Sequence, residues 1–140
     1  MNLMSYSVQT PTKAALPSLL IADDDPVVHS VLTGQLEGHF DIVAVAVDAQ
    51  EAIDLVGRHN PDVALIDVMM PAGGGLRAIS EIHHHSPDTT IAAFSGDESE
   101  RGVLDMLNAG AITYIRKGIG AQELAQKLVL CMKSHRNVGD

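Results

Sequence analysis

Residues 19–26 read Leu-Leu-Ile-Ala-Asp-Asp-Asp-Pro, a short apolar run that stops abruptly at three carboxylates. A run this short, ended by charged residues, is typical of a buried strand rather than of a helix. Asp25 can then act as the N-cap of a helix that has Pro26 at its first position. The stretch therefore predicts a strand, a sharp turn and a helix in immediate succession.

The same strand-then-helix pattern recurs along the rest of the chain. Further apolar runs, each followed by apolar side chains at helical spacing, occupy residues 42–47, 63–66, 90–94 and 112–115. Gly110 is placed to end the helix that precedes the last of these runs, because glycine tolerates the left-handed conformation at a helix C-terminus. Five strands alternating with five helices predict an α/β fold, a doubly wound parallel sheet with helices on both faces.

With 140 residues the chain has room for one domain with a single core. We assign residues 18–134 to this domain. Residues 1–17 are rich in Ser, Thr, Gln and Pro, and we interpret them as a flexible N-terminal tail. We interpret residues 135–140 as a C-terminal tail or the start of a linker.

Charge and composition narrow the class of protein further. A net charge of −9, with the basic residues scattered, argues against direct contact with nucleic acid. The single cysteine, Cys131, lies at an apolar helical position and is interpreted as a core residue in a reducing compartment. The N-terminal residues do not show a basic n-region followed by an apolar h-region, and no apolar run approaches the length needed to span a bilayer. We therefore expect a cytoplasmic protein without membrane contact.

Polar side chains follow four of the five predicted strands. Asp23 and Asp24 come after the first strand, Asp67 after the third, Ser95 ends the fourth, and the fifth leads into Lys117. In a parallel sheet these strand ends meet at one edge, where ligands bind. Three carboxylates in one crevice repel each other, and Mg²⁺, which prefers hard oxygen ligands, would relieve that repulsion.

This group of side chains predicts phosphoryl transfer. A carboxylate beside Mg²⁺, here Asp67, can act as the nucleophile toward a phosphoryl group. Lys117 would offer a positive charge to one phosphoryl oxygen, and Ser95 a hydrogen bond to another. No Cys/His cluster has the spacing of a zinc site, and the run at residues 83–85, three histidines, is interpreted as a solvated helix end.

The chain resembles the response-regulator receiver family of two-component signalling. The resemblance covers about residues 18–134 and rests on four motifs in the family's order: Leu19-Leu20-Ile21-Ala22-Asp23-Asp24-Asp25-Pro26, Leu65-Ile66-Asp67-Val68-Met69-Met70-Pro71, Phe94-Ser95-Gly96 and Tyr114-Ile115-Arg116-Lys117. It implies a chemotaxis-regulator-like, flavodoxin-like (βα)5 sandwich with a five-stranded parallel sheet in the order 2-1-3-4-5.

The resemblance also implies roles for individual residues. Asp67 matches the phosphoacceptor, which would act with Lys117 and Ser95. The magnesium ligands would be Asp23, Asp24, Asp67 and the backbone carbonyl of Met69. Ser95 and Tyr114 match the two switch residues that shift after phosphorylation.

The partners implied are a sensor histidine kinase or a phosphotransfer protein, whose phosphohistidine would donate to Asp67. Phosphorylation would alter the surface formed by the helix around residues 103–107, the strand 112–115 and the last helix. That surface could bind a partner, a second copy of the chain, or an output domain attached in a longer chain. Such a protein catalyses its own phosphorylation and dephosphorylation but is not a turnover enzyme.

Two departures from the family pattern leave alternatives open. Lys117 is followed by Gly118, where the family usually has a proline after a cis peptide; cis before a non-proline residue costs about 2.5–4 kcal/mol, so we predict a trans bond. The loop at residues 71–75 is also richer in glycine than usual. A receiver-like docking module that works without phosphorylation is therefore the alternative function. An aspartate-based phosphatase fits less well, because Met69 stands where a second acid/base carboxylate would be required.

Overall fold

The computed structural model describes residues 16–71 and 74–139. Residues 1–15, which make up most of the predicted tail, lie outside these ranges, as do residues 72–73 of the glycine-rich loop and residue 140. Within the described ranges the chain forms five strands and five helices in strict alternation.

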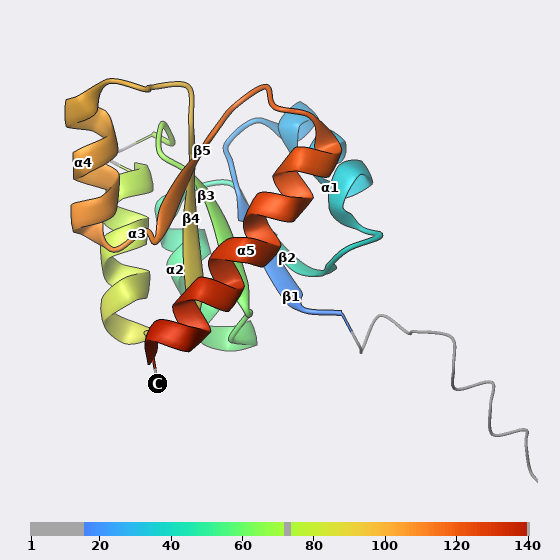
Figure 1. Cartoon of the computed structure of the whole chain (residues 1–140), viewed down its shortest axis with the longest axis horizontal. Helices are drawn as coiled ribbons and strands as arrows, with labels where there is room; N and C mark the ends of the chain where they lie inside the picture. Colours follow the sequence, from blue (N-terminus) through green and yellow to red (C-terminus); the bar gives the residue numbers. More distant parts are fainter. Residues whose placement is uncertain (1–15, 72–73, 140) are drawn as a thin grey trace, which may run out of the picture.

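The five strands form a single parallel sheet in the order β2-β1-β3-β4-β5, which confirms the predicted fold (Figure 1). The strands are β1 (Ser18–Ala22), β2 (Asp41–Ala46), β3 (Val63–Asp67), β4 (Thr90–Ser95) and β5 (Thr113–Arg116). The helices are α1 (Pro26–Leu36), α2 (Ala49–His59), α3 (Gly74–His85), α4 (Glu100–Ala109) and α5 (Ala121–Gly139).

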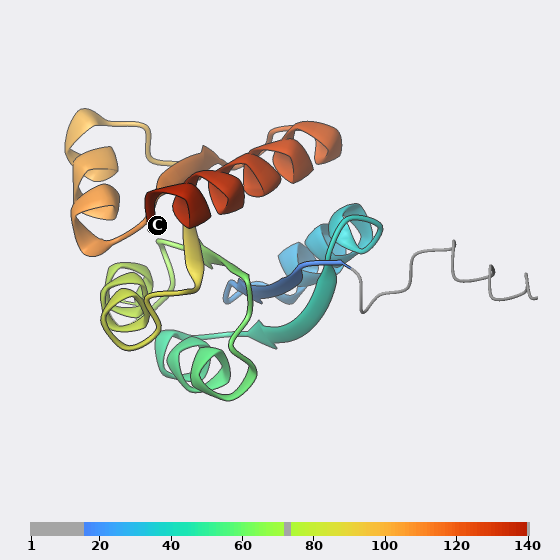
Figure 2. The same cartoon turned by 60° about the horizontal axis from the view of Figure 1, so that its bottom comes forward.

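Helices cover both faces of the sheet (Figure 2), and a separate hydrophobic core lies on each face. On one face α1 and α5 pack through residues such as Leu36 and Leu128, and on the other α2, α3 and α4 pack through residues such as Val56, Ile79 and Met106. Every residue of β3 and β4 is buried, because helices cover both faces of the central strands. Continuous apolar runs rather than alternating ones are the sequence pattern of such strands.

The first two helices begin at side-chain caps, and the first of these is the Asp25 cap that the sequence predicts. The Asp25 side chain accepts a hydrogen bond from the backbone N–H of Val27 at 2.9 Å. Asp48 accepts from the N–H of Glu51 at 2.8 Å, and the Glu51 carboxylate accepts from the N–H of Val47 at 2.8 Å. Each bond satisfies a backbone donor that a helix N-terminus leaves free. The turn after β1 is therefore defined locally, by the residues that follow the strand.

The last helix continues beyond the domain boundary that we placed at residue 134, as far as Gly139. Its final turns contact the start of the central strands: His135 Nδ1 lies 2.8 Å from the Thr90 hydroxyl, and Arg136 forms an ion pair of 2.8 Å with Asp62. These contacts hold residues that we assigned to the C-terminal tail, His135 and Arg136, against the rest of the domain. None of the helices in the described ranges combines the length and apolar character needed to cross a membrane.

Cys131 lies in the core formed by α1, α5 and the sheet, with only 6% of its surface exposed. Burial raises the pKa of its thiol to about 11 from a usual value of 9.0. Because the unfolded thiol ionises first, the free energy of unfolding is expected to fall by about 2 kcal/mol between pH 8.5 and pH 10.5.

Urea unfolding across this pH range measures the effect, with Cys131→Ala as the reference for all other titrating groups. The variant should lack this part of the decrease. Equal pH dependence in both proteins would show that the thiol is not shielded as its burial implies.

Candidate functional site

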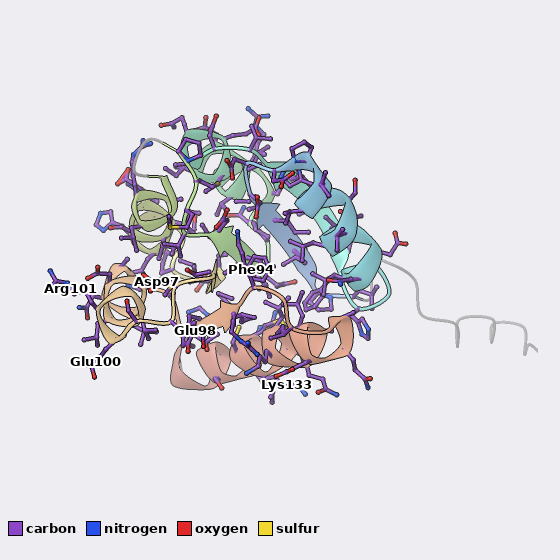
Figure 3. All side chains as sticks on the ribbon, turned by 90° about the horizontal axis from the view of Figure 1, so that it is seen from above. Phe94, Asp97, Glu98, Glu100, Arg101 and Lys133 are labelled. Atoms are coloured by element: carbon purple, nitrogen blue, oxygen red, sulfur yellow. The ribbon has the colours of Figure 1, made fainter. Side chains whose placement is uncertain are left out.

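The polar residues predicted at the strand ends do lie at one edge of the sheet. Asp67 and Ser95 are the last residues of β3 and β4, and Asp23 and Lys117 directly follow β1 and β5. Figure 3 looks onto the molecule from above, with Phe94 near the middle and the acidic residues Asp97, Glu98 and Glu100 toward α4. The carboxyl ends of β1, β3, β4 and β5 thus bring these polar residues to the same edge of the sheet, as a parallel topology requires.

Asp23, Asp24 and Asp67 form a compact acidic cluster. Each offers one carboxylate oxygen, and these oxygens all lie within 4.8 Å of one another. Asp23 and Asp67 are buried, with 1% and 2% of their surface exposed, whereas Asp24 is exposed. The described residues contain no second cluster of three such metal-binding groups. Negative charge packed this closely and shielded from water is costly unless a cation is present.

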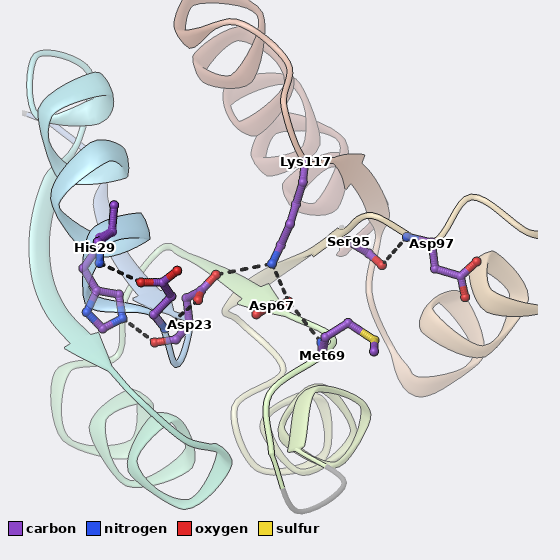
Figure 4. Close-up of polar contacts among 9 residues, drawn as sticks. Asp23, His29, Asp67, Met69, Ser95, Asp97 and Lys117 are labelled. Carbon is purple, nitrogen blue, oxygen red and sulfur yellow. Dashed lines mark hydrogen bonds and ion pairs between the residues drawn. The ribbon is translucent and has the colours of Figure 1, made fainter.

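Lys117 supplies one cation to this cluster (Figure 4). Its Nζ lies 3.0 Å from Asp67 Oδ1 and 3.6 Å from Asp23 Oδ2, and 5.5 Å from the centre of the Phe94 ring. Burial alone would lower the pKa of Lys117, but the hydrogen bond to Asp67 and the charges of both carboxylates outweigh it and raise the pKa. Lys117 is therefore held in its charged form between the two buried carboxylates.

One buried carboxylate oxygen in the cluster lacks a hydrogen bond, although it lies within ion-pair distance of Lys117. Asp23 Oδ1 accepts from the N–H of Asp25 at 2.9 Å, but the buried Oδ2 has no hydrogen-bond donor among the described residues. Burial, the largest influence, raises the pKa of Asp23, and the neighbouring charge of Asp67 raises it further. A buried oxygen without a hydrogen bond, within a trio of carboxylates, matches the hard oxygen ligands that Mg²⁺ prefers. The residues present thus fit a hard divalent cation.

The bond after Lys117 is trans, as predicted, since the described residues contain no cis peptide. Gly118 has φ of +95°, a left-handed conformation that proline cannot adopt because its ring holds φ near −65°. The main chain of Lys117 is held by a 3.0 Å hydrogen bond from its N–H to the carbonyl of Ser95. The departure from the family pattern at Gly118 thus leaves Lys117 in contact with Asp67.

Met69 lies two residues beyond Asp67 with a side chain that is 70% exposed. Its backbone N–H donates to Asp67 Oδ1 at 3.0 Å, so the loop after β3 already helps to orient the carboxylate (Figure 4). The role of its carbonyl as a metal ligand stays a prediction.

The two residues predicted to act as switches lie in different settings. Ser95 is fully buried, and its Oγ accepts a hydrogen bond from the N–H of Asp97 at 2.9 Å, so it faces the loop leading to α4 (Figure 4). Hydrogen bonds from Ser99 lower the pKa of Asp97 and order that loop. Tyr114 is half-buried and packs against the core that includes Met106. Their switching roles stay predictions.

His29 is a site residue that the sequence analysis missed. It is half-buried, and its Nε2 contacts the main-chain carbonyl of Asp23 (Figure 4). The available signal is its spacing: residue 29 lies one helical turn after the N-cap Asp25. A side chain at that position points back over the turn that precedes it.

Comparisons with known proteins agree on one family. The model of the response regulator receiver domain matches residues 19–129. The transcriptional regulatory protein PdtaR of Mycobacterium tuberculosis is 33% identical over 133 residues, covering 92% of this chain and 63% of PdtaR. The response regulator GacA of Pseudomonas viridiflava is 30% identical over 122 residues, covering 86% of this chain and 57% of GacA.

A solved structure of similar shape is the two-component response regulator of the LuxR family from Aurantimonas sp. It has a TM-score of 0.80 and 26% identity, and the match covers 85% of this chain and 86% of that one. The chain thus spans less than two thirds of the length of these two curated relatives.

Proposed function

This chain belongs to the response regulator receiver family of two-component systems, and we propose on that premise that Asp67 accepts a phosphoryl group with Mg²⁺ bound beside it. The observation that carries the proposal is the buried pair of carboxylates, Asp23 and Asp67, that share Lys117 while one oxygen of Asp23 stays without a hydrogen bond. A site built to hold an extra cation and an extra anion explains this arrangement better than a structural ion pair does.

The proposed step is a displacement at phosphorus. An oxygen of Asp67 attacks the phosphoryl group of a phosphohistidine, a P–O bond forms, and the P–N bond breaks. The electron pair of that bond passes to the imidazole nitrogen, which takes up a proton. Hydrolysis of the acyl phosphate later returns Asp67 to a free carboxylate.

Each neighbouring residue has a task in this step. Mg²⁺ would be held by Asp23, Asp24, Asp67 and the carbonyl of Met69. When bound, it would supply positive charge that offsets the repulsion between Asp67 and the incoming phosphoryl oxygens. Lys117 would pair with a second phosphoryl oxygen, exchanging part of its contact with Asp67 for the new anion. The Ser95 hydroxyl would turn away from the N–H of Asp97 and donate a hydrogen bond to a third phosphoryl oxygen.

The signalling partners belong to the same proposal. The donor would be a sensor histidine kinase or a phosphotransfer protein in the cytoplasm. Movement of Ser95 and Tyr114 would change the surface formed by α4, β5 and α5, which could bind a partner, a second copy or an attached output domain. The chain would act as a phosphorylated switch rather than as a turnover enzyme.

Incubation with acetyl phosphate and Mg²⁺, followed by intact-mass measurement, tests the proposal. The wild-type protein should gain about 80 Da, the mass of one phosphoryl group. Asp67→Asn should gain nothing, and the matched variant Asp88→Asn, at an exposed turn, should behave as wild type. No gain in the wild type, together with no Mg²⁺ affinity, would instead favour a docking module that works without phosphate.

A further inference from the structure

We infer that His29 is a positioning residue for the magnesium site: its imidazole holds the peptide that joins Asp23 to Asp24. The observation is the contact between His29 Nε2 and the carbonyl oxygen of Asp23, which links the first turns of α1 to the acidic loop (Figure 4). The inference rests on the proposed function, because it assigns His29 a task in the cation site of that function.

Besides its ion pair with Lys117, Asp23 makes three hydrogen-bond contacts, and each holds a different part of the residue. Its N–H donates to the carbonyl of Ala46 at 3.0 Å, which fixes the main chain against the end of β2. Its Oδ1 accepts from the N–H of Asp25 at 2.9 Å, which fixes the carboxylate. His29 holds the remaining group, the carbonyl, and therefore sets the plane of the following peptide.

That peptide determines where Asp24 lies. The Asp24 side chain is exposed and makes no hydrogen bond to any of the described residues, although one of its oxygens belongs to the cluster within 4.8 Å. Among the described residues, the position of this carboxylate near Asp23 and Asp67 therefore depends on its main chain. A peptide free to rotate would spread Asp24 over several positions, and a metal ion would have to order it on binding.

The contact can be made only with a proton on Nε2, since a carbonyl oxygen accepts hydrogen bonds and cannot donate them. The neutral ring with its proton on Nε2 meets this requirement, so no change of charge is involved. A side chain that places an N–H at the same distance from Cα, such as glutamine, should replace the imidazole.

The ring is not needed to form the helix. The N-terminus of α1 is capped by Asp25, and the backbone N–H of His29 donates to the carbonyl of Asp25 at 3.2 Å whatever side chain it carries. Removing the ring donor should therefore disturb the site more than the fold. This separation makes the inference testable.

The test compares His29→Phe, which keeps a ring but lacks the donor, with His29→Gln, which restores an N–H. His84→Phe is the matched control, because His84 is exposed at the end of α3. Titration calorimetry measures the Kd for Mg²⁺, and phosphorylation by acetyl phosphate is followed over a range of Mg²⁺ concentrations. Thermal unfolding in EDTA reports on the fold of each variant.

His29→Phe is expected to raise the Kd for Mg²⁺ about 3- to 10-fold, the effect of losing one hydrogen bond. Its phosphorylation rate at saturating Mg²⁺ should stay within about two-fold of wild type, as should the Kd values of His29→Gln and His84→Phe. Equal Mg²⁺ affinity in wild type and His29→Phe would overturn this inference alone, and so would a glutamine variant as weak as the phenylalanine one. A wild-type chain that takes up neither Mg²⁺ nor a phosphoryl group would overturn the proposed function as well.

Discussion

Replacement of Lys117 by methionine is expected to slow phosphorylation of Asp67 by acetyl phosphate at least about 100-fold at saturating Mg²⁺. Lys117 Nζ lies 3.0 Å from Asp67 Oδ1, so it is already placed beside the position where a phosphoryl group would bind. Methionine has a similar length and keeps the contact with the Phe94 ring, but it brings no charge to the phosphoryl oxygens. The change therefore removes electrostatic stabilisation with little change in shape.

The same substitution should also destabilise the metal-free protein. It leaves Asp23 and Asp67 buried without a cation, a situation that is costly in a protein interior. Because the Lys117 side chain is 33% exposed, water screens part of this effect, and we expect a loss of about 1–3 kcal/mol. Added Mg²⁺ should restore much of the loss, since it brings positive charge to the same oxygens.

Intact-mass kinetics and urea unfolding with and without Mg²⁺ measure the two effects. Lys133→Met, at an exposed position of α5, is the matched control and should change neither quantity appreciably. A phosphorylation rate in Lys117→Met close to that of the wild type would contradict the assigned role. If Lys117→Met were as stable as the wild type without Mg²⁺, the burial of Asp23 and Asp67 would not depend on the charge of this lysine.

Substitution of Gly75 by alanine is expected to destabilise the protein by about 3 kcal/mol or more, or to prevent folding. A Cβ at this position would lie 2.2 Å from Val68 Cα, 2.4 Å from the Val68 carbonyl oxygen and 2.5 Å from that of Asp67. These neighbours are backbone atoms, which cannot turn aside as a flexible side chain could. The added methyl group would therefore push α3 and the end of β3 apart.

Two other glycines in helices provide controls for this prediction. A Cβ at Gly34 of α1 or Gly57 of α2 would meet nothing within 4 Å. Alanine there should stabilise the protein by about 0.5–1 kcal/mol, because alanine favours the helix more than glycine does. Urea unfolding of the three variants gives the comparison. A Gly75→Ala protein as stable as Gly57→Ala would show that the close approach is not required.

From the sequence we placed residues 71–75 in a glycine-rich loop, whereas α3 already begins at Gly74. Gly74 and Gly75 are instead buried at the start of α3, where Gly75 lets the helix lie directly against the backbone of the proposed phosphoacceptor. We therefore expect that any Gly75→Ala protein that does fold is phosphorylated on Asp67 more slowly than the wild type.

Periodicity predicted the helices well but the orientation of their side chains less well. In α1 the apolar residues Val28, Val31, Leu32 and Leu36 are spaced to lie on one face of the helix. Leu32 and Leu36 are buried, whereas Val31 is 50% exposed and lines an open apolar pocket with Phe94 and Lys117. The spacing of apolar residues defines a stripe on a helix, but the neighbouring elements determine how much of that stripe is covered.

What the sequence by itself determined was the order of the elements and the convergence of Asp23, Asp67, Ser95 and Lys117 at one edge. Each strand and its terminating residue are adjacent in the chain, and a parallel sheet brings every carboxyl end to the same side. Only the tertiary structure decided how these groups contact one another. It placed Lys117 Nζ 3.0 Å from Asp67 Oδ1 and 3.6 Å from Asp23 Oδ2, and it buried that Oδ2 without a hydrogen bond from the described residues. Lys117 and the two carboxylates lie on segments far apart in the chain, so these distances depend on how the strands and helices pack, which the residues around each group do not specify.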